Sequence, residues 1–555
     1  MCPHPICHSL PRTYIALPGL RQAPCLVLLP GCTSTMSTNT VFDGPAVSSP
    51  GPIDLTHSTA SDASSSSPPL QSRQQSRHSS SSATGDCDII PPFHPARTLV
   101  LCFDGTGDQF DTDNSNVVKF FSLLKKDDRN EQMCYYQTGI GTYIGHGGVL
   151  PVMAKIDKLL DEMIAWNLGT HVMDGYEFLM QNYQAGDKIC LFGFSRGAYT
   201  ARALAGMLHK VGLLPACNHQ QVPFAYKMFA RDDELGWKQS TSFKKAFSID
   251  VDIDFIGVWD TVASVGVIPH TLPFTRSNKS IRIFRHALAL DEHRARFKPA
   301  LYQHVPDAAA RGTQPGDMPK SDTIVGTREG WDKLKKGGLK GKKRSEHEHD
   351  FDAQNARDGQ DHTDVKEVWF AGCHCDIGGG SVDDDTPHTL ARIPLRWMIR
   401  ECFKKDTGIR FHAELLKDIG LDPASLHPVV KDRPTALEPD TPHFNTVAGP
   451  APEVSEEEHE VRDALSPIYD QLALAPYWWL LEFLPMQTRI QGPAPQRKMH
   501  KTIGLNMGRG RHVPKHHTPF FIHRSVLTRM QAKGLSDGPY KPKATYGKLE
   551  VNWVD

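Results

Sequence analysis

The sequence predicts an α/β fold with a mostly parallel sheet and helices on both of its faces. Apolar segments of strand length recur along the chain, helical patterns lie between them, and each apolar segment ends in polar or glycine-rich sequence, a pattern typical of α/β proteins. The strand candidates are TLVLCFDGTG at 98–107, QMCYYQTGIGT at 132–142, KICLFGFS at 188–195, DIDFIGVWDTVASVG at 252–266 and VKEVWFAGCHCDIGGG at 365–380. Helical patterns between them include NVVKFFSLLKK at 116–126 and a long segment at 152–183.

The N-terminal part of the chain is expected to be a disordered leader, residues 1–90. Residues 44–88 consist largely of Ser, Pro, Thr and Gln, a composition that cannot bury enough apolar surface to fold. The first 35 residues contain an apolar stretch, but prolines interrupt it, so it matches neither a membrane span nor a signal peptide. Ordered structure should begin near Pro91.

Two further regions define the expected domain organisation. A catalytic domain is predicted at 91–405, interrupted at about 306–364 by a highly charged insertion that is nearly free of apolar residues and is therefore expected to be disordered. Its basic cluster leaves nuclear import or contact with anionic lipids open, although a solvated loop is the favoured interpretation. Residues 406–555 are expected to form a C-terminal extension packed on the catalytic domain.

The net charge and the cysteine spacing exclude two classes of protein. The formal net charge is −1, which argues against a general nucleic-acid binder. The chain has 12 cysteines, but Cys102, Cys134 and Cys190 fall in predicted strands, without the regular spacing of a secreted disulfide framework. A reducing, cytoplasmic compartment is the expected location.

Ser195 lies between two glycines at the junction of a predicted strand and a predicted helix. The pentapeptide Gly193-Phe194-Ser195-Arg196-Gly197 has the G-x-S-x-G spacing in which small neighbours let a strand and a helix close on a strained serine. The amide of Arg196, at the helix N-terminus, could then face a developing oxyanion. The competing interpretation is that Ser195 is only the helix N-cap.

Asp260 and His374 complete a Ser, Asp, His order along the chain, each at the end of a predicted strand. In this arrangement His374 takes the serine proton and Asp260 orients the imidazole. Gly105 and Thr106, after the first strand, are predicted to supply the second oxyanion amide.

Each of these assignments has a rival in the sequence. Asp260 could simply cap a turn, and His286 and His523 compete with His374 as the base. Asp376 is a candidate supporting acid or an alternative partner of the histidine. Asp104 in FDGTG is a further candidate supporting residue of the site. It could also be a phosphatase nucleophile, but Thr106 stands where that motif has a second Asp.

No metal or organic cofactor is expected. Cys373-His374-Cys375 is the one sequence pattern that suggests a metal, but successive residues of an extended segment point to alternate sides and cannot close on one ion.

The chain resembles a known family through six ordered motifs over roughly residues 96–400. The motifs are CFDGTGDQF with Asn116-Val117, GIGT at 139–142, GFSRGAYTARALAGML, FIGVWDTVASVG, RHALALDEHRARFKP and VWFAGCHCDIGGG. They resemble the α/β-hydrolase domain of Tle1-like type VI secretion phospholipase effectors, also common in fungi. The resemblance implies an α/β-hydrolase fold, a triad on Ser195, Asp260 and His374, and phospholipase activity.

The segment SPIYDQLALAPYWWLLEFLPMQ at 466–487 is rich in aromatic and aliphatic residues. An interfacial or lid helix would explain this composition, and so would a helix packed on the sheet. We expect the second, because Pro476 and Pro485 leave only a short element.

The function predicted from sequence is therefore hydrolysis of carboxylic esters through an acyl-enzyme. The expected partner is a lipid or other ester substrate, with peripheral membrane contact left open. A catalytically silent interaction module and a small-ester or thioester hydrolase are the alternatives.

Overall fold

The computed structural model describes residues 88–105, 110–139, 153–262, 271–303, 347–348, 350–352, 362–439, 454–491, 499–514, 517–533, 535 and 538–555. For 153–167, 486–491 and 499–502 it describes the backbone alone. Residues 1–87 of the expected leader, most of the charged insertion and Thr106 lie outside the described residues. The end of the expected leader is ordered, since Ile89 and Ile90 form a short strand.

An eight-stranded sheet with the order β12-β11-β7-β6-β5-β4-β2-β3 forms the centre of the fold. Every pair of neighbouring strands in it is parallel. The α/β class and the mostly parallel sheet predicted from the sequence are thereby confirmed. The strands are β2 Thr98–Phe103, β3 Gln132–Gln137, β4 Lys188–Phe194, β5 Ile253–Trp259, β6 Ile281–Ala289, β7 Asp364–Phe370, β11 Phe520–His523 and β12 Val551–Val554.

The five predicted strand segments contain β2, β3, β4, β5 and β7, whereas the sequence did not predict β6, β11 or β12. In β6 the reason is visible. Its apolar run is interrupted by Arg285 and His286, which are both buried. Arg285 pairs with Glu401 at 2.6 Å, and His286 Nδ1 lies 2.8 Å from Glu367 Oε1. These tertiary partners satisfy the polar groups inside the sheet. The partners are distant in the sequence, so the local pattern of β6 does not predict them.

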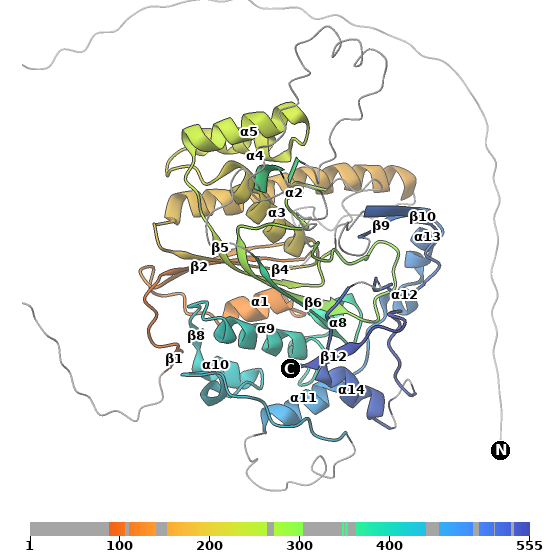
Figure 1. Ribbon diagram of the computed structural model, residues 1–555. Helices are drawn as coiled ribbons and strands as arrows, with labels where there is room; N and C mark the ends of the chain where they lie inside the picture. The colour runs from red at the N-terminus through yellow and green to blue at the C-terminus, as the bar shows by residue number, and fades with distance from the viewer. Residues whose placement is uncertain are drawn as a thin grey trace, which may run out of the picture. The chain divides into compact units, whose positions relative to one another are not determined.

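Helices cover both faces of the sheet, as predicted (Figure 1). One layer holds α2 Met153–Asn182, α3 Ser195–Val211, α4 Val222–Ala230 and α5 Glu234–Phe247, and the other holds α1 Asn116–Ser122, α9 Arg392–Lys404, α11 Glu456–Ala464 and α14 Arg524–Gln531. Each layer has its own hydrophobic core. Phe192 and Trp259 lie in one core, and Leu191 and Val258, their sequence neighbours, in the other, as expected for strands buried on both faces.

Shorter elements surround the sheet. They are the antiparallel pair β1 Ile89–Ile90 and β8 Phe411–His412, the hairpin β9 Met486–Gln491 and β10 Met499–Gly504, the helices α8 His374–Gly378, α10 Ala413–Asp418, α12 Gln471–Leu474 and α13 Trp479–Glu482, and 3-10 turns at His219–Gln221, Pro423–Ser425 and Pro476–Trp478. Among the described helices, none combines the length and the apolar character needed to cross a bilayer.

Part of the region expected to be a disordered insertion has structure. The described residues 347–348 and 350–352 are helical. Phe351 is buried and lies 5.5 Å from the ring of Phe274 and 5.9 Å from that of Trp237. His209 Nε2 lies 2.8 Å from Asp352 Oδ1.

The strand order places a topological switch at β2. The chain adds β3 on one side of β2 and then β4 on the other, and continues in that second direction. Phe103 at the end of β2 pairs with Gly193 near the end of β4. Ligands of open α/β sheets bind beyond the carboxyl ends of the strands at such a switch, so the loops after β2 and β4 mark the expected binding edge.

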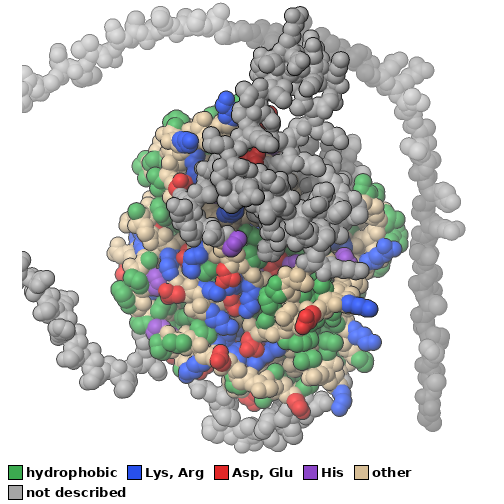
Figure 2. All heavy atoms as spheres, in the orientation of Figure 1, with side chains coloured by type: hydrophobic (Ala, Val, Ile, Leu, Met, Phe, Trp, Pro, Cys, Tyr) green, Lys and Arg blue, Asp and Glu red, His purple; other side chains and the backbone are tan. Residues whose placement is uncertain are grey.

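The surface in Figure 2 mixes both signs of charge. Described Lys and Arg side chains lie interleaved with Asp and Glu on this face. This distribution agrees with the near-zero net charge of the chain.

Candidate active site

Ser195 is the first residue of α3 and follows β4 directly. Its φ of 56° lies in the left-handed region, which is unfavourable for a residue with a side chain. The N-cap position belongs to Phe194, and the Ser195 hydroxyl is hydrogen-bonded to His374 instead. The alternative that Ser195 is only an N-cap is therefore wrong.

The two glycines that flank Ser195 permit this turn. A Cβ on Gly193 would lie 2.6 Å from the carbonyl oxygen of Gly197. A Cβ on Gly197 would lie 2.2 Å from the carbonyl oxygen of Phe103 and 2.3 Å from that of Asp104, at the end of β2. Both positions are thus closed to any larger residue, and α3 begins against the end of β2.

His374 lies between Ser195 and Asp260. It begins α8, shortly after β7 ends, and its Nε2 lies 2.8 Å from Ser195 Oγ. Its Nδ1 lies 2.5 Å from Asp260 Oδ2. This network assigns the proton to Nδ1, so that Nε2 accepts from the serine hydroxyl.

Aromatic rings hold the His374 imidazole from two sides. The ring of Phe194 lies 4.7 Å away and tilted, and that of Phe297 lies 4.8 Å away in an edge-on arrangement. The His374 backbone N–H donates to the buried Glu292 at 3.2 Å. Packing and the backbone therefore fix the imidazole orientation together with its two side-chain partners.

Asp260 follows β5 and is fully buried. Its Oδ1 accepts from the backbone N–H of Ala289 at 3.0 Å. Arg511 Nη1 lies 2.5 Å from Oδ1, and Nη2 lies 2.8 Å from Oδ2. The carboxylate therefore has a buried, bidentate cationic partner in addition to His374.

Arg511 is the main residue of this site that the sequence analysis missed. It also donates to the carbonyl oxygens of Ala289 and Phe297, so all its neighbours come from distant parts of the chain. The segment GRGRH, which holds Arg511 and a second arginine, Arg509, carries no local signal of such a role. Glu292 was missed for the same reason, although it lies in the quoted motif RHALALDEHRARFKP.

The ionisation states follow from burial and from these partners. Burial acts to raise the pKa of Asp260, but the charge of Arg511 and hydrogen bonds from His374 and Arg511 outweigh it and hold that pKa well below its usual range. Burial lowers the pKa of His374, and the opposing influence of Asp260 does not fully restore it. At neutral pH the pair is therefore a carboxylate and a neutral imidazole.

The loop after β2 is held by Asp104, which is buried. Its Oδ1 accepts from Ser115 Oγ at 2.6 Å and from the Gly105 amide at 2.9 Å, and its Oδ2 accepts from Tyr136 at 2.7 Å. Burial raises the pKa of Asp104 despite these hydrogen bonds. The carboxylate thus anchors the loop, which does not favour the phosphatase interpretation.

The three residues predicted to form the oxyanion hole differ in whether their backbone amides are available to it. Arg196 follows Ser195 in the first turn of α3. The Gly105 amide is already hydrogen-bonded to Asp104. Thr106 lies outside the described residues, so the role predicted for it stays a prediction.

Asp376 supports the helix that carries His374. Its Oδ2 accepts from the backbone N–H of Cys373 at 2.8 Å and from that of Tyr469 at 3.1 Å. The alternative in which Asp376 pairs with His374 is therefore wrong, because Asp260 holds that position. Burial raises the pKa of Asp376 to about 7.

The rival histidines have partners elsewhere. The Thr261 backbone N–H donates to His286 Nε2 at 3.0 Å, and His286 Nδ1 faces Glu367. His523 Nδ1 lies 2.8 Å from Ser525 Oγ, and its ring stacks on Phe370 at 4.9 Å. Of the three candidates, His374 is the one that the structure brings to Ser195.

The cysteines near His374 make contacts within the chain. Cys373 Sγ lies 3.4 Å from the carbonyl oxygen of Asp291. Within the described ranges, no group of three His, Cys, Asp or Glu side chains is arranged to hold a metal ion, and the seven described cysteines are free thiols.

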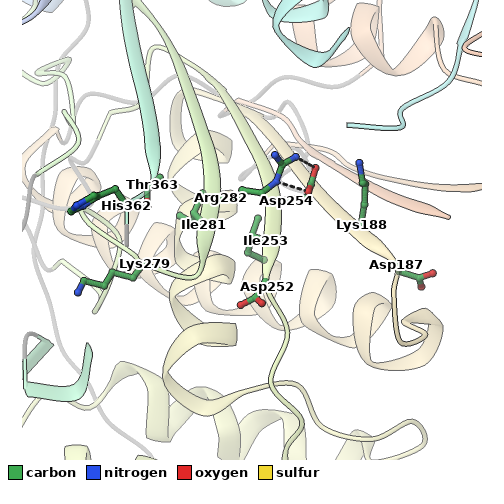
Figure 3. A pocket seen from close by; sticks show the side chains of 10 residues that line it. All are labelled: Asp187, Lys188, Asp252, Ile253, Asp254, Lys279, Ile281, Arg282, His362 and Thr363. Carbon is green, nitrogen blue, oxygen red and sulfur yellow. Dashed lines mark hydrogen bonds and ion pairs between the residues drawn. The ribbon is translucent and has the colours of Figure 1, made fainter. Parts of the chain in front are cut away.

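A cavity of about 340 Å³ lies at the opposite edge of the sheet. Figure 3 shows that residues at the amino ends of the strands line it, among them Lys188, Asp254 and Arg282. Arg282 and Asp254 neutralise each other through two hydrogen bonds of 2.8 and 2.9 Å. Because β5 separates this edge from Asp260, the cavity is not part of the candidate active site.

The aromatic segment at 466–487 differs from expectation. We predicted that its side chains pack on the sheet, yet Leu474, Tyr477 and Leu480 are 63, 60 and 57 % exposed. Pro476 begins a 3-10 turn that separates α12 from α13, and Pro485 follows α13. These elements are too short to turn a continuous apolar face inward.

Comparison with known proteins adds a family and several relatives. The family model described as "T6SS, Phospholipase effector Tle1-like, catalytic domain" matches residues 97–401. Uncharacterized protein YEL023C of Saccharomyces cerevisiae is 28 % identical over 577 aligned residues, which cover 82 % of this chain and 82 % of that protein.

Two solved structures are similar at lower levels. An uncharacterized protein from Pseudomonas aeruginosa has 17 % identity and a TM-score of 0.29, with 58 % of this chain and 47 % of that chain covered. The Tle1 effector bound to the VgrG spike from the type 6 secretion system has 17 % identity and a TM-score of 0.23, with 52 % of each chain covered. The chain thus spans about half the length of these two structures.

Proposed function

The chain belongs to the family of Tle1-like phospholipase effector catalytic domains, and we propose that it is a serine hydrolase that cleaves the acyl esters of lipids, phospholipids foremost. The observation that carries this proposal is the chain of hydrogen bonds from Ser195 Oγ to His374 Nε2, at 2.8 Å, and from His374 Nδ1 to Asp260 Oδ2, at 2.5 Å. A serine, a neutral imidazole and a carboxylate in this order form an activated nucleophile.

In the first half of the proposed reaction, Ser195 Oγ attacks the carbonyl carbon of the ester while its proton passes to His374 Nε2. The imidazolium that forms is stabilised by Asp260, which remains ionised. When the tetrahedral intermediate collapses, the bond to the alcohol oxygen breaks and that oxygen receives the proton from His374. The acyl group is then esterified to Ser195.

In the second half, a water molecule attacks the acyl-enzyme as His374 takes one of its protons. The carboxylic acid leaves when the bond between the acyl carbon and Ser195 Oγ breaks, and Oγ recovers its proton from His374. Neither half needs a metal or an organic cofactor.

The Arg196 amide is the proposed oxyanion donor, because it follows the nucleophile at the N-terminus of α3, where the helix dipole favours negative charge. The Gly105 amide can join it only if it leaves Asp104. We therefore retain Thr106 as the predicted second donor.

The test is hydrolysis of phosphatidylcholine vesicles by the full chain, with release of fatty acid followed by mass spectrometry. Ser195→Ala should abolish the release, whereas Ser122→Ala, at an exposed position on α1, should leave it unchanged. Fatty-acid release that persists in Ser195→Ala would contradict the proposal. Cleavage of soluble short-chain esters alone would favour the small-ester alternative.

A further inference from the structure

A short segment beside the candidate active site presents large apolar side chains to solvent. We call the following six residues, with their exposed fractions, the apolar patch: Leu474 63 %, Tyr477 60 %, Trp479 40 %, Leu480 57 %, Phe483 56 % and Leu484 40 %. Exposed apolar residues scattered singly are ordinary on soluble proteins, but a group this dense marks an interaction surface.

The one charged side chain of this segment is turned away from solvent. Glu482 is the one charged residue between Asp470 and Arg489, and it is 1 % exposed. Its carboxylate accepts from the backbone N–H of Ala295 at 2.5 Å and from Asn506 Nδ2 at 2.7 Å. The side chain of Glu482 thus attaches the segment to Ala295 and Asn506. The solvent-facing side of the segment is left uncharged.

Packing connects the segment directly to His374. The ring of Trp478 meets that of Phe297 edge-on at 5.4 Å, and Phe297 in turn lies 4.8 Å from His374. The guanidinium of Arg294 lies 3.6 Å from the Phe297 ring and 4.9 Å from that of Trp478. The rings of Trp478 and Phe297 therefore connect the segment that carries the apolar patch to the proposed catalytic base.

The same surface continues onto the end of β10 and the residues that follow it. Ile503 is 72 % exposed, Leu505 47 % and Met507 42 %. A Cβ on Gly508 would lie 3.0 Å from the Trp479 ring, which places this stretch against α13. Figure 1 shows α12, α13 and the β9–β10 hairpin together on one side of the sheet.

We propose that the apolar patch docks the protein on the surface of a phospholipid bilayer, with the candidate active site facing the lipid. The choice of lipid as the occupant rests on the proposed function. The chemistry of the surface favours it, because the polar side-chain atoms exposed among these six residues belong to Tyr477 and Trp479, the residue types that settle at membrane interfaces. A protein–protein interface surrounds its apolar core with a polar rim, whereas Glu482, the one charged residue of this segment, is buried.

The test is flotation of the full chain with phosphatidylcholine vesicles, measured on the Ser195→Ala protein so that no lipid is consumed. The Ser195→Ala protein should float with the vesicles, and adding Leu480→Glu and Phe483→Glu together should reduce the bound fraction at least ten-fold. Leu235→Glu is the matched control, since Leu235 is 51 % exposed on α5, and it should bind as well as its parent. Phe483→Ser, a milder change, should give an intermediate loss.

Binding that is unchanged in the double Glu variant, or absent in its parent, would overturn the proposal. A doubled molar mass by light scattering that the double variant returns to the monomer value, without vesicle binding, would assign the surface to a second copy and also overturn it. Vesicle binding through the apolar patch, combined with no lipid hydrolysis by the native protein, would support the docking surface and would reject the proposed function.

Discussion

Arg511 donates to both carboxylate oxygens of Asp260, at 2.5 and 2.8 Å, in a site from which solvent is excluded. This pairing fixes the plane of the carboxylate, so that Oδ2 faces His374 Nδ1. It also keeps Asp260 ionised despite its burial. Arg511 lies beyond residues 97–401, to which the family model extends, so the C-terminal part of the chain completes the site.

Arg511 is a positioning residue, and its replacement should lower activity in a graded way. Arg511→Lys keeps the charge but loses the two parallel hydrogen bonds, so we expect kcat/KM to fall about ten-fold. Arg511→Met should lower it on the order of a hundred-fold, as expected for a misplaced catalytic group. Steady-state kinetics on a soluble ester measure both effects.

The pH profile of the same variants separates positioning from simple loss of structure. Without the Arg511 charge, Asp260 stabilises the imidazolium more strongly, so the acid limb of kcat/KM should move to higher pH in Arg511→Met and less in Arg511→Lys. Losing one partner of a buried ion pair also costs roughly 3–5 kcal/mol of stability, so thermal unfolding is measured in parallel. Folded variants with the native profile would refute the positioning role.

In the native protein, the acid limb of kcat/KM should lie below the usual histidine range. His374 accepts the serine proton only when it is neutral, and burial lowers the pKa of its imidazole. Activity should therefore persist as the pH falls and be lost with a midpoint below about 6.5. Kinetics on a soluble short-chain ester avoid effects of pH on lipid packing, and a midpoint above 7 would contradict this account.

The centre of the fold and the three polar groups of the site could be predicted from the sequence, because short stretches of sequence carry the signal for each of them. The apolar runs of β2, β4 and β5 are buried on both faces, and Ser195, Asp260 and His374 each follow a strand. The strand β6 was not predictable from its own residues, because Arg285 and His286 are tolerated there only through Glu401 and Glu367.

Long-range partners explain what the sequence could not predict about the site. The role of Arg511 depends on Asp260, 251 positions earlier in the chain. The orientation of the apolar patch depends on Glu482 reaching Asn506 and Ala295. Neither relationship leaves a periodic or motif signal, whereas the spacing around Ser195 does, because its glycines meet backbone atoms at fixed positions.

Gly197→Ala should prevent the turn at Ser195 from forming. The new Cβ would lie 2.2 Å from the Phe103 carbonyl oxygen and 2.3 Å from that of Asp104, and backbone cannot yield as a side chain can. We expect a loss of about 3 kcal/mol or more in the free energy of unfolding. Chemical denaturation measures it, with Gly504→Ala as the control because its Cβ would meet nothing within 4 Å. Equal stability of the two variants would contradict the close approach.

Asp376 should make stability fall as the pH rises. Burial raises its pKa in the folded protein from 3.8 to about 7, so the folded state retains a proton that the unfolded chain releases at lower pH. The free energy of unfolding should therefore decrease between about pH 4 and 7, by at most on the order of 4 kcal/mol from this group. Asp376→Asn keeps an oxygen for Cys373 and Tyr469 and removes the titration.

Denaturation of the native protein and of Asp376→Asn at pH 5 and pH 8 isolates this effect. The stability difference between the two pH values should be smaller in the Asn variant, and the variant should be the more stable protein at pH 8. An unchanged pH dependence would show that the buried carboxyl does not titrate in this window.

The most direct test of the central claim is labelling of the purified full chain with a fluorophosphonate probe, with the modified residue identified by mass spectrometry. The probe reacts with a serine only when a neighbouring base activates it. This account predicts one adduct, on Ser195, that is lost in Ser195→Ala and in His374→Ala and kept in Ser122→Ala. A folded native protein that the probe leaves unlabelled at Ser195 would contradict it.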